Sequence, residues 1–296
     1  MFIALAITGY ALLGVVALLD KFILSKKISS PLTYSFYIST PFIFLFLVIP
    51  FGIQWPVSMY DWIFVVGSGL FFLAGLCLMF LGIKKSEISH VGPLVGATVS
   101  LSSVILGRLF LGEILPLNKI IGISFLIIGA LIISFEKSKK HNGIHLGMLW
   151  GVLAGVCFSA SYIVTKFIYN DLGFWSGLVW SKGILGLGGL CLLLSPIVRK
   201  EIRQKNGTKE KTSKGIVLIN LILSVVGVLL IQFAISIGSV SVVSAFEGLK
   251  YAILIILVAL LSWFFPKILK EDYAKGEIVQ EILAIFLICL GLIILI

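Results

Sequence analysis

Residues 19–26 read LDKFILSK, and residues 164–171 read VTKFIYND. Both stretches place Lys-Phe-Ile near the end of a long apolar run. A helix needs about 20 apolar residues to cross the hydrocarbon core of a bilayer, and both runs reach that length. The recurrence therefore predicts a membrane protein in which one half of the chain repeats the other.

The composition of the whole chain supports this interpretation. Its 296 residues are 59% hydrophobic and 12% charged, and the mean hydropathy is +1.17. A soluble domain needs more polar residues to cover its core, so the composition indicates a polytopic membrane protein. The net charge of +10 arises mostly in short segments between apolar runs. That distribution is typical of membrane topology and argues against a nucleic-acid partner.

Ten apolar runs are long enough to cross a bilayer, and we expect each to be a helix. A helix satisfies all of its backbone groups within one segment, as lipid surroundings require. The connections are short, so we expect an all-α polytopic membrane protein without a soluble domain. The first run has no small-residue cleavage site and has an internal copy, so we expect it to be retained. The ten runs cover 2–24, 31–52, 61–83, 88–110, 117–135, 145–169, 173–196, 215–237, 240–264 and 278–296.

Basic residues are concentrated after the odd-numbered runs. Lys26 and Lys27 follow the first run, Lys84 and Lys85 follow the third, and the densest set lies within 199–214. Cytoplasmic loops of membrane proteins carry such an excess of Lys and Arg. We therefore expect these connections to lie in the cytoplasm, both termini to face outward, and the protein to reside in the plasma membrane.

The two halves of the chain, 1–140 and 141–296, each hold five of the ten runs. An odd number of spans per copy requires the second copy to be inserted upside down. The result is an inverted repeat about a pseudo-two-fold axis in the membrane plane, an arrangement that places a transporter's substrate site between the halves. The ordered matches are DKFIL (20–24) with TKFIY (165–169), SEISHVGPLVG (86–96) with GSVSVVSAFEG (238–248), and IIGALII (127–133) with CLGLIIL (289–295).

Residues 91–133 read VGPLVGATVSLSSVILGRLFLGEILPLNKIIGISFLIIGALII. This segment resembles the fourth and fifth helices of an EamA-type repeat: a helix rich in small residues that ends in LGE, a short polar turn, then IG and IIGALII. The resemblance implies a member of the drug/metabolite transporter superfamily with two five-helix repeats and a small metabolite as substrate. The second half departs from this pattern, because LSWFFPKILKEDYAKG (261–276) replaces the LGE end. Family members carry diverse substrates, so the resemblance names none.

Three ionisable residues lie deep within the expected spans. A charge at this depth costs about 2.5–3.5 kcal/mol on insertion scales, which makes each one a site hypothesis. Glu247 and Lys250 are one turn apart on the same helix face. They form a self-neutralising pair, or they line a cavity in which Lys250 binds an anionic group and Glu247 a cation or proton; the two interpretations are compatible. Lys182 either snorkels to the outer face or pairs with Glu247.

The fourth span is rich in Gly, Ser and Thr, which permits close helix packing. Pro93 removes a backbone hydrogen bond and can open the helix locally. The alternative interpretation is therefore that His90, Pro93, Thr98 and Ser102 face a substrate cavity.

Spans one and six carry further candidates for substrate binding. Ser159, Tyr162 and Lys166 share one face of the sixth span by their spacing, and Tyr10 occupies the corresponding region of the first span. Packing and hydrogen bonding within the bundle are the alternative role for these side chains. Lys166 differs from Lys21 because the inversion places it on the outer side, so we predict a contact at the outer mouth of the pathway. We interpret Glu113 of the LGE motif as a helix-end residue that pairs with Arg108 or Lys119.

These features favour a secondary transporter working by alternating access, with a central site lined by spans 1, 3, 4, 6, 8 and 9. The sequence contains no P-loop motif, no HExxH motif and no set of nucleophile and base, so we expect no enzyme activity, no catalytic residues, no bound metal and no cofactor. The expected partners are a small-molecule substrate, the lipid bilayer and a coupling ion, a proton or sodium. We expect a monomer or a homodimer. The alternative function is that of a lipid or headgroup flippase, or of a scaffold subunit that transports nothing.

Overall fold

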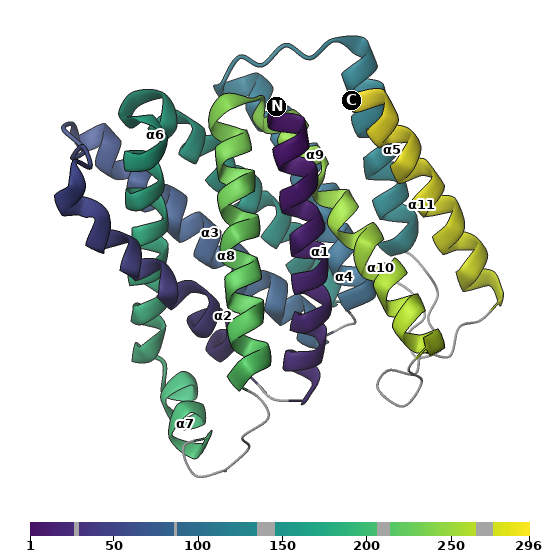
Figure 1. The fold of residues 1–296 in the computed structure, drawn as a ribbon, viewed down its shortest axis with the longest axis horizontal. Coiled ribbons are helices and arrows are strands. Elements are labelled where there is room, and N and C mark those ends of the chain that lie inside the picture. Colours follow the sequence, from purple (N-terminus) through teal and green to yellow (C-terminus); the bar gives the residue numbers. More distant parts are fainter. Residues whose placement is uncertain (27–29, 86–87, 135–145, 206–213, 265–274) are drawn as a thin grey trace.

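The computed structural model describes residues 1–26, 30–85, 88–134, 146–205, 214–264 and 275–296. Within these ranges all regular structure is helical (Figure 1), which confirms the prediction of an all-α protein. The helices are α1 (Phe2–Lys26), α2 (Pro31–Ser39), η1 (Thr40–Phe51), α3 (Met59–Lys85), α4 (Ile88–Phe110), α5 (Leu117–Ser134), α6 (Leu146–Cys191), η2 (Leu192–Leu194), α7 (Pro196–Lys205), α8 (Lys214–Ile237), α9 (Val240–Ala245), α10 (Glu247–Phe264) and α11 (Lys275–Leu295).

The helices are long and apolar enough for a multi-pass membrane protein. Eight candidate spans occur in the described residues, and the shorter apolar stretch 279–295 of α11 adds another. The candidate span at 147–194 has 48 residues, about twice what one crossing requires. Its chain reverses at Gly173, whose φ of 73° and ψ of 171° are not helical and suit a residue without a Cβ atom. Counting its two arms, 146–172 and 174–191, separately gives the ten predicted crossings.

Three local features were not predicted from the sequence. The second span changes from α2 into the 3₁₀ helix η1. The basic segment after the seventh span forms a short helix, α7. The ninth span is divided at Phe246 into α9 and α10. The division leaves Glu247 in the first turn of α10, where the helix dipole favours a negative charge.

Helices α5 and α11 lie side by side (Figure 1) and touch through glycines. A Cβ atom on Gly122 would lie 3.0 Å from the carbonyl oxygen of Gly291, and one on Gly291 would lie 2.7 Å from that of Gly122. About two turns further along the same face of α5, a Cβ atom on Gly129 would lie 2.9 Å from the carbonyl oxygen of Ala284. The contacts run in opposite directions along the two helices, so α5 and α11 are antiparallel.

Both chain termini lie at one end of the bundle, and α7 lies at the other (Figure 1). The outer surface carries many exposed large apolar side chains, among them Phe44, Ile105, Leu149, Ile222 and Phe286. Such a surface is normal against lipid and unusual in a soluble monomer. The interior, by contrast, holds several polar and charged side chains, and three of them, Asp20, Gln232 and Glu247, line one cavity.

Candidate functional site

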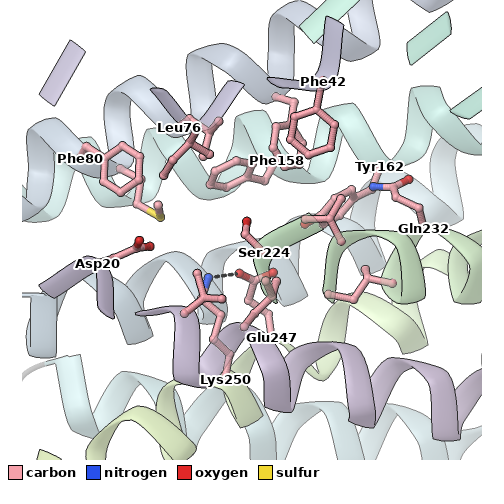
Figure 2. A pocket seen from close by; sticks show the side chains of 17 residues that line it. Asp20, Phe42, Leu76, Phe80, Phe158, Tyr162, Ser224, Gln232, Glu247 and Lys250 are labelled. Atoms are coloured by element: carbon pink, nitrogen blue, oxygen red, sulfur yellow. Dashed lines mark hydrogen bonds and ion pairs between the residues drawn. The ribbon is translucent and has the colours of Figure 1, made fainter. Parts of the chain in front are cut away.

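A cavity of about 80 Å³ lies in the middle of the helix bundle (Figure 2). Helices from both halves of the chain form its walls: α1, α2, η1 and α3 from the first half, and α6, α8 and α10 from the second. Most of the wall is apolar or aromatic, with a few polar groups. The lining residues are Leu13, Val16, Asp20, Ile38, Phe42, Phe72, Leu76, Met79, Phe80, Phe158, Tyr162, Ser224, Val228, Ile231, Gln232, Glu247 and Lys250.

Glu247 and Lys250 form an ion pair on the wall of this cavity (Figure 2). Lys250 Nζ lies 3.0 Å from Glu247 Oε1, and the ammonium also lies 4.6 Å from the centroid of the Tyr251 ring. Glu247 is only 3% exposed. Its second carboxylate oxygen, Oε2, is buried and has no hydrogen-bond partner among the described residues. The two interpretations of the pair therefore coexist: it neutralises itself in part, and it presents an unused acceptor beside the cavity.

Two tyrosines lie beside this carboxylate. Tyr162 lines the cavity from the first arm of α6, and Tyr10 of α1 is fully buried. The Tyr10 hydroxyl lies beside Tyr162 and Glu247. Both residues were sequence candidates, and the structure brings both to Glu247.

Asp20 is a lining residue that the sequence analysis did not select. Its carboxylate accepts hydrogen bonds from the hydroxyl of Tyr34 and from the side-chain amide of Asn220, the latter at 2.8 Å. The donors come from α2 and α8, so three helices hold this carboxylate in place. Lys250 lies within Coulombic range of it, and Figure 2 shows both side chains directed into the same space. One feature of the sequence pointed to Asp20: the first copy of the repeated motif, DKFIL, has Asp20 where the second copy, TKFIY, has Thr165.

Besides Asp20 and Ser224, the sequence analysis missed one more polar lining residue, Gln232. It lies on α8 and is 1% exposed, and its side-chain oxygen accepts a hydrogen bond from the Tyr169 hydroxyl at 2.9 Å. Aromatic rings form another part of the lining, in which Phe72 meets Phe158 edge to face with ring centroids 5.1 Å apart. Such a wall suits an apolar or aromatic ligand body.

Lys182 lies behind this aromatic wall. It is 2% exposed, and its ammonium rests 4.0 Å from the centroid of the Phe72 ring. Neither expected role is seen, because the side chain does not reach the surface and the ion pair of Glu247 is with Lys250. Phe72 lines the cavity and Lys182 does not, so the ring separates this charge from the cavity.

No α4 residue whose side chain the structure describes lines this cavity, whereas residues of the second span do. The small residues of α4 are used for packing instead. A Cβ atom on Gly92 would lie 2.4 Å from the Tyr251 ring, and one on Gly155 would lie 2.6 Å from Thr98. The Thr98 hydroxyl donates to Leu94 within its own helix.

The remaining candidates from these helices are also placed within the bundle. Pro93 is buried in α4, and the Ser159 hydroxyl pairs with that of Ser103 at 3.0 Å. The backbone of His90 lies in α4, whereas the prediction about its side chain lies outside the described residues.

Lys166 and Glu113 hold the turn between α8 and α9. The Lys166 ammonium donates to the carbonyl oxygens of Ile235, Ser236 and Gly238 at 2.9–3.1 Å. Its three donors are thereby all used inside the protein. Positive charge is favourable at a helix C-terminus, so the structure gives Lys166 a helix-end role where the sequence predicted a contact at the outer mouth.

The carboxylate of Glu113 occupies the start of α9. It accepts hydrogen bonds from the backbone N–H groups of Val240 and Ser241 and from the hydroxyls of Ser239 and Ser241. The predicted helix-end role is correct, but the helix is α9 rather than its own. The pairing with Arg108 or Lys119 is not seen.

The described residues contain no group of three or more His, Cys, Asp or Glu side chains that could hold a metal ion. The lining residues of the cavity offer recognition by charge, hydrogen bonding and aromatic contact. A pocket of this kind, mostly apolar with a few convergent polar groups, is typical of a small-molecule binding site.

The sequence of residues 1–135 matches the EamA-like transporter family. The match agrees with the resemblance of the segment 91–133 to this family. EamA proteins are transporters, not enzymes, and together with the multi-pass fold the match supports a membrane transporter of the drug/metabolite type. A small-molecule substrate and a surrounding lipid bilayer follow from that class.

Solved structures share the fold of this chain. Among solved structures 28 chains match. One of them, described only as "Crystal structure of protein", is 15% identical and gives a TM-score of 0.66 over 98% of this chain and 94% of that chain. At this identity the likeness shows the fold alone. Compared by sequence with curated proteins, the chain matches none.

Proposed function

We propose that this protein is a secondary transporter that carries a small metabolite across the plasma membrane by alternating access. The observation that carries the proposal is the central cavity, which helices of both halves line and which contains a buried ion pair with a free carboxylate oxygen. Charged groups are expensive at this depth in a membrane and are retained where they bind a substrate or an ion.

The moving parts in this proposal are two inverted five-helix repeats, residues 1–140 and 141–296. The alignment of IIGALII with CLGLIIL pairs Gly129 with Gly291, and by the same offset Gly122 with Ala284. The contacts between α5 and α11 join Gly122 to Gly291 and Gly129 to Ala284. Each contact is thus the symmetry mate of the other, as a pseudo-two-fold axis between antiparallel helices requires. Rocking about this axis would expose the cavity to each side in turn.

Energy for transport would come from a gradient of a coupling ion, a proton or sodium. Asp20 and Glu247 are the buried carboxylates of the cavity and are the groups able to take up such an ion. We place the basic helix α7 in the cytoplasm by the positive-inside rule. Both termini lie at the opposite end of the bundle and so face outward in this proposal. One chain lines the whole cavity, so a monomer or each copy in a homodimer would hold a complete site.

Flux into proteoliposomes tests this proposal. Purified protein is reconstituted, and uptake of labelled amino acids, amines, sugars and drug-like solutes is measured with and without a pH or sodium gradient. We expect saturable uptake of at least one solute class that protein-free liposomes lack. Absence of uptake for every class, together with scrambling of a labelled lipid, would assign a lipid flippase instead. Absence of both would favour a scaffold subunit.

A further inference from the structure

The charged groups that line the central cavity do not balance. They are the carboxylates of Asp20 and Glu247 and the ammonium of Lys250, which together leave one negative charge when both carboxylates are ionised. Lys182 does not enter this count, because the ring of Phe72 lies between it and the cavity. An unbalanced charge in surroundings of low polarity is costly, and a ligand that neutralises it gains that free energy on binding.

Lys250 and Asp20 line the same cavity from the neighbouring helices α10 and α1. The Lys250 ammonium is bound to Glu247 Oε1, and Figure 2 shows its side chain and that of Asp20 directed into the same space. The Lys250 ammonium is carried on a flexible four-carbon chain, which lets it move from Glu247 towards Asp20. Asp20 is already held by Tyr34 and Asn220 and would need no rearrangement to receive it.

We infer that the substrate is a monocation with an apolar or aromatic body, and that its ammonium group displaces Lys250 from Glu247 towards Asp20. This inference rests on the proposed transport function. With such a substrate bound, Glu247 pairs with the ligand, Asp20 pairs with Lys250, and no charge is left over. A neutral solute leaves one negative charge unpaired, and an anion bound to Lys250 leaves both carboxylates unpaired.

Two further observations fit the same ligand. Glu247 Oε2 is a buried acceptor that no described residue uses, and an ammonium group supplies the missing donors. The rings of Phe42, Phe72, Phe80, Phe158 and Tyr162 line the cavity around the charged groups, and aromatic faces attract cations as well as apolar bodies.

Three probes that share a phenylethyl group and differ in the charge of the head group test the inference. They are phenethylamine, 2-phenylethanol and 3-phenylpropionate, whose head groups are cationic, neutral and anionic. Binding to the purified full-length protein is measured by calorimetry, and flux by competition in proteoliposomes. We expect the amine to bind about 10- to 100-fold more tightly than the alcohol, the value of a hydrogen-bonded ion pair, and the carboxylate to bind no better than the alcohol.

Two variants separate this exchange from general binding. Asp20→Asn keeps the size of the side chain but removes the charge that receives Lys250, so amine affinity should fall about tenfold or more while the alcohol is unaffected. Lys250→Met removes the competitor for Glu247, so the amine should bind at least as tightly as to the wild type. Because the two expected shifts have opposite directions, a variant that is merely misfolded cannot imitate the pattern.

The inference is overturned if the alcohol or the carboxylate binds as tightly as the amine, if the amine does not bind, or if Lys250→Met abolishes amine binding in a folded protein. Saturable flux of a neutral or anionic solute with no effect of the amine would overturn the inference and leave the proposed transport function intact. No flux of any solute would instead count against the transport function itself.

Discussion

The carboxylate of Glu113 accepts hydrogen bonds from both the backbone N–H and the hydroxyl of Ser241, a residue 128 positions further along the chain. Glu113 belongs to the LGE end of the first half, and Ser241 lies in the first turn of α9 in the second half. A connection between the two halves is thus made by a charged group at a helix N-terminus, a position that favours anions.

We expect Glu113→Gln to lower stability, because the amide keeps one acceptor oxygen and loses the charge. Hydrogen bonds to a charged group contribute about 1.5–3 kcal/mol each, so a loss of about 2 kcal/mol or more is expected. Thermal unfolding in detergent micelles measures it. Arg108→Ala is the control, because Arg108 is exposed and should leave the melting temperature within about 1 °C of wild type. Equal melting temperatures for both variants would contradict the helix-end role.

Lys166→Met removes the three donors that satisfy the carbonyl groups at the end of α8. We expect a lower melting temperature and an unchanged KM for a transported solute, because the ammonium is engaged inside the protein. Lys119→Met is the matched control at the same end of the bundle. A raised KM with unchanged stability would instead support the contact at the outer mouth that the sequence predicted.

The glycines between α5 and α11 should resist enlargement. In Gly122→Ala and Gly291→Ala the added methyl group would meet a backbone carbonyl oxygen at 3.0 Å and 2.7 Å. Backbone cannot move aside cheaply, so each variant should lose about 1–3 kcal/mol of stability. Gly67→Ala is the control, because its nearest neighbour is 4.0 Å away, and an alanine within a helix is about 0.5–1 kcal/mol more favourable than glycine. Unchanged melting temperatures in both interface variants would contradict the described packing.

Accessibility to a membrane-impermeant thiol reagent tests the orientation. In a variant without native cysteines, Ile114→Cys lies at the end with the termini and Arg203→Cys lies on α7; both native side chains are exposed. We expect labelling at 114 in intact cells and at 203 only after the membrane is opened. The reverse pattern would place the termini in the cytoplasm and overturn the topology inferred from Lys and Arg.

The sequence was sufficient to predict the ten crossings, because the length of an apolar helix is set by the thickness of the bilayer. It was also sufficient to select Glu247 and Lys250, since a charge deep within a span is conspicuous. It left two roles open for α4, packing and lining the cavity; Pro93 is buried, Thr98 packs against Gly155, and neither lines this cavity. The direction in which such a helix faces depends on which neighbour fits its small residues, such as Tyr251 against Gly92, and composition does not specify that.

Asp20 was overlooked for a related reason. Near the end of a span the free-energy cost of placing a carboxylate in the membrane is small. The position of Asp20 alone therefore does not distinguish an interfacial residue from a cavity residue. The hydrogen bonds that assign it come from Tyr34 and Asn220, on helices that are adjacent only in the folded chain. The break at Phe246 was equally hidden, because residues 240–246 contain neither proline nor glycine.

The central claim is that the cavity is a transport site, and it depends on the Glu247–Lys250 ion pair of α10. Flux of a solute that the wild-type protein carries in proteoliposomes should be lost in Glu247→Gln and in Lys250→Ala. Asp171→Asn and Lys200→Met are matched controls, because both native side chains are exposed, and they should transport at wild-type rates. The measurement is the initial rate of uptake at saturating solute, for variants whose melting temperatures show that they fold. We predict near-zero flux for both cavity variants, and wild-type flux in both would contradict the account.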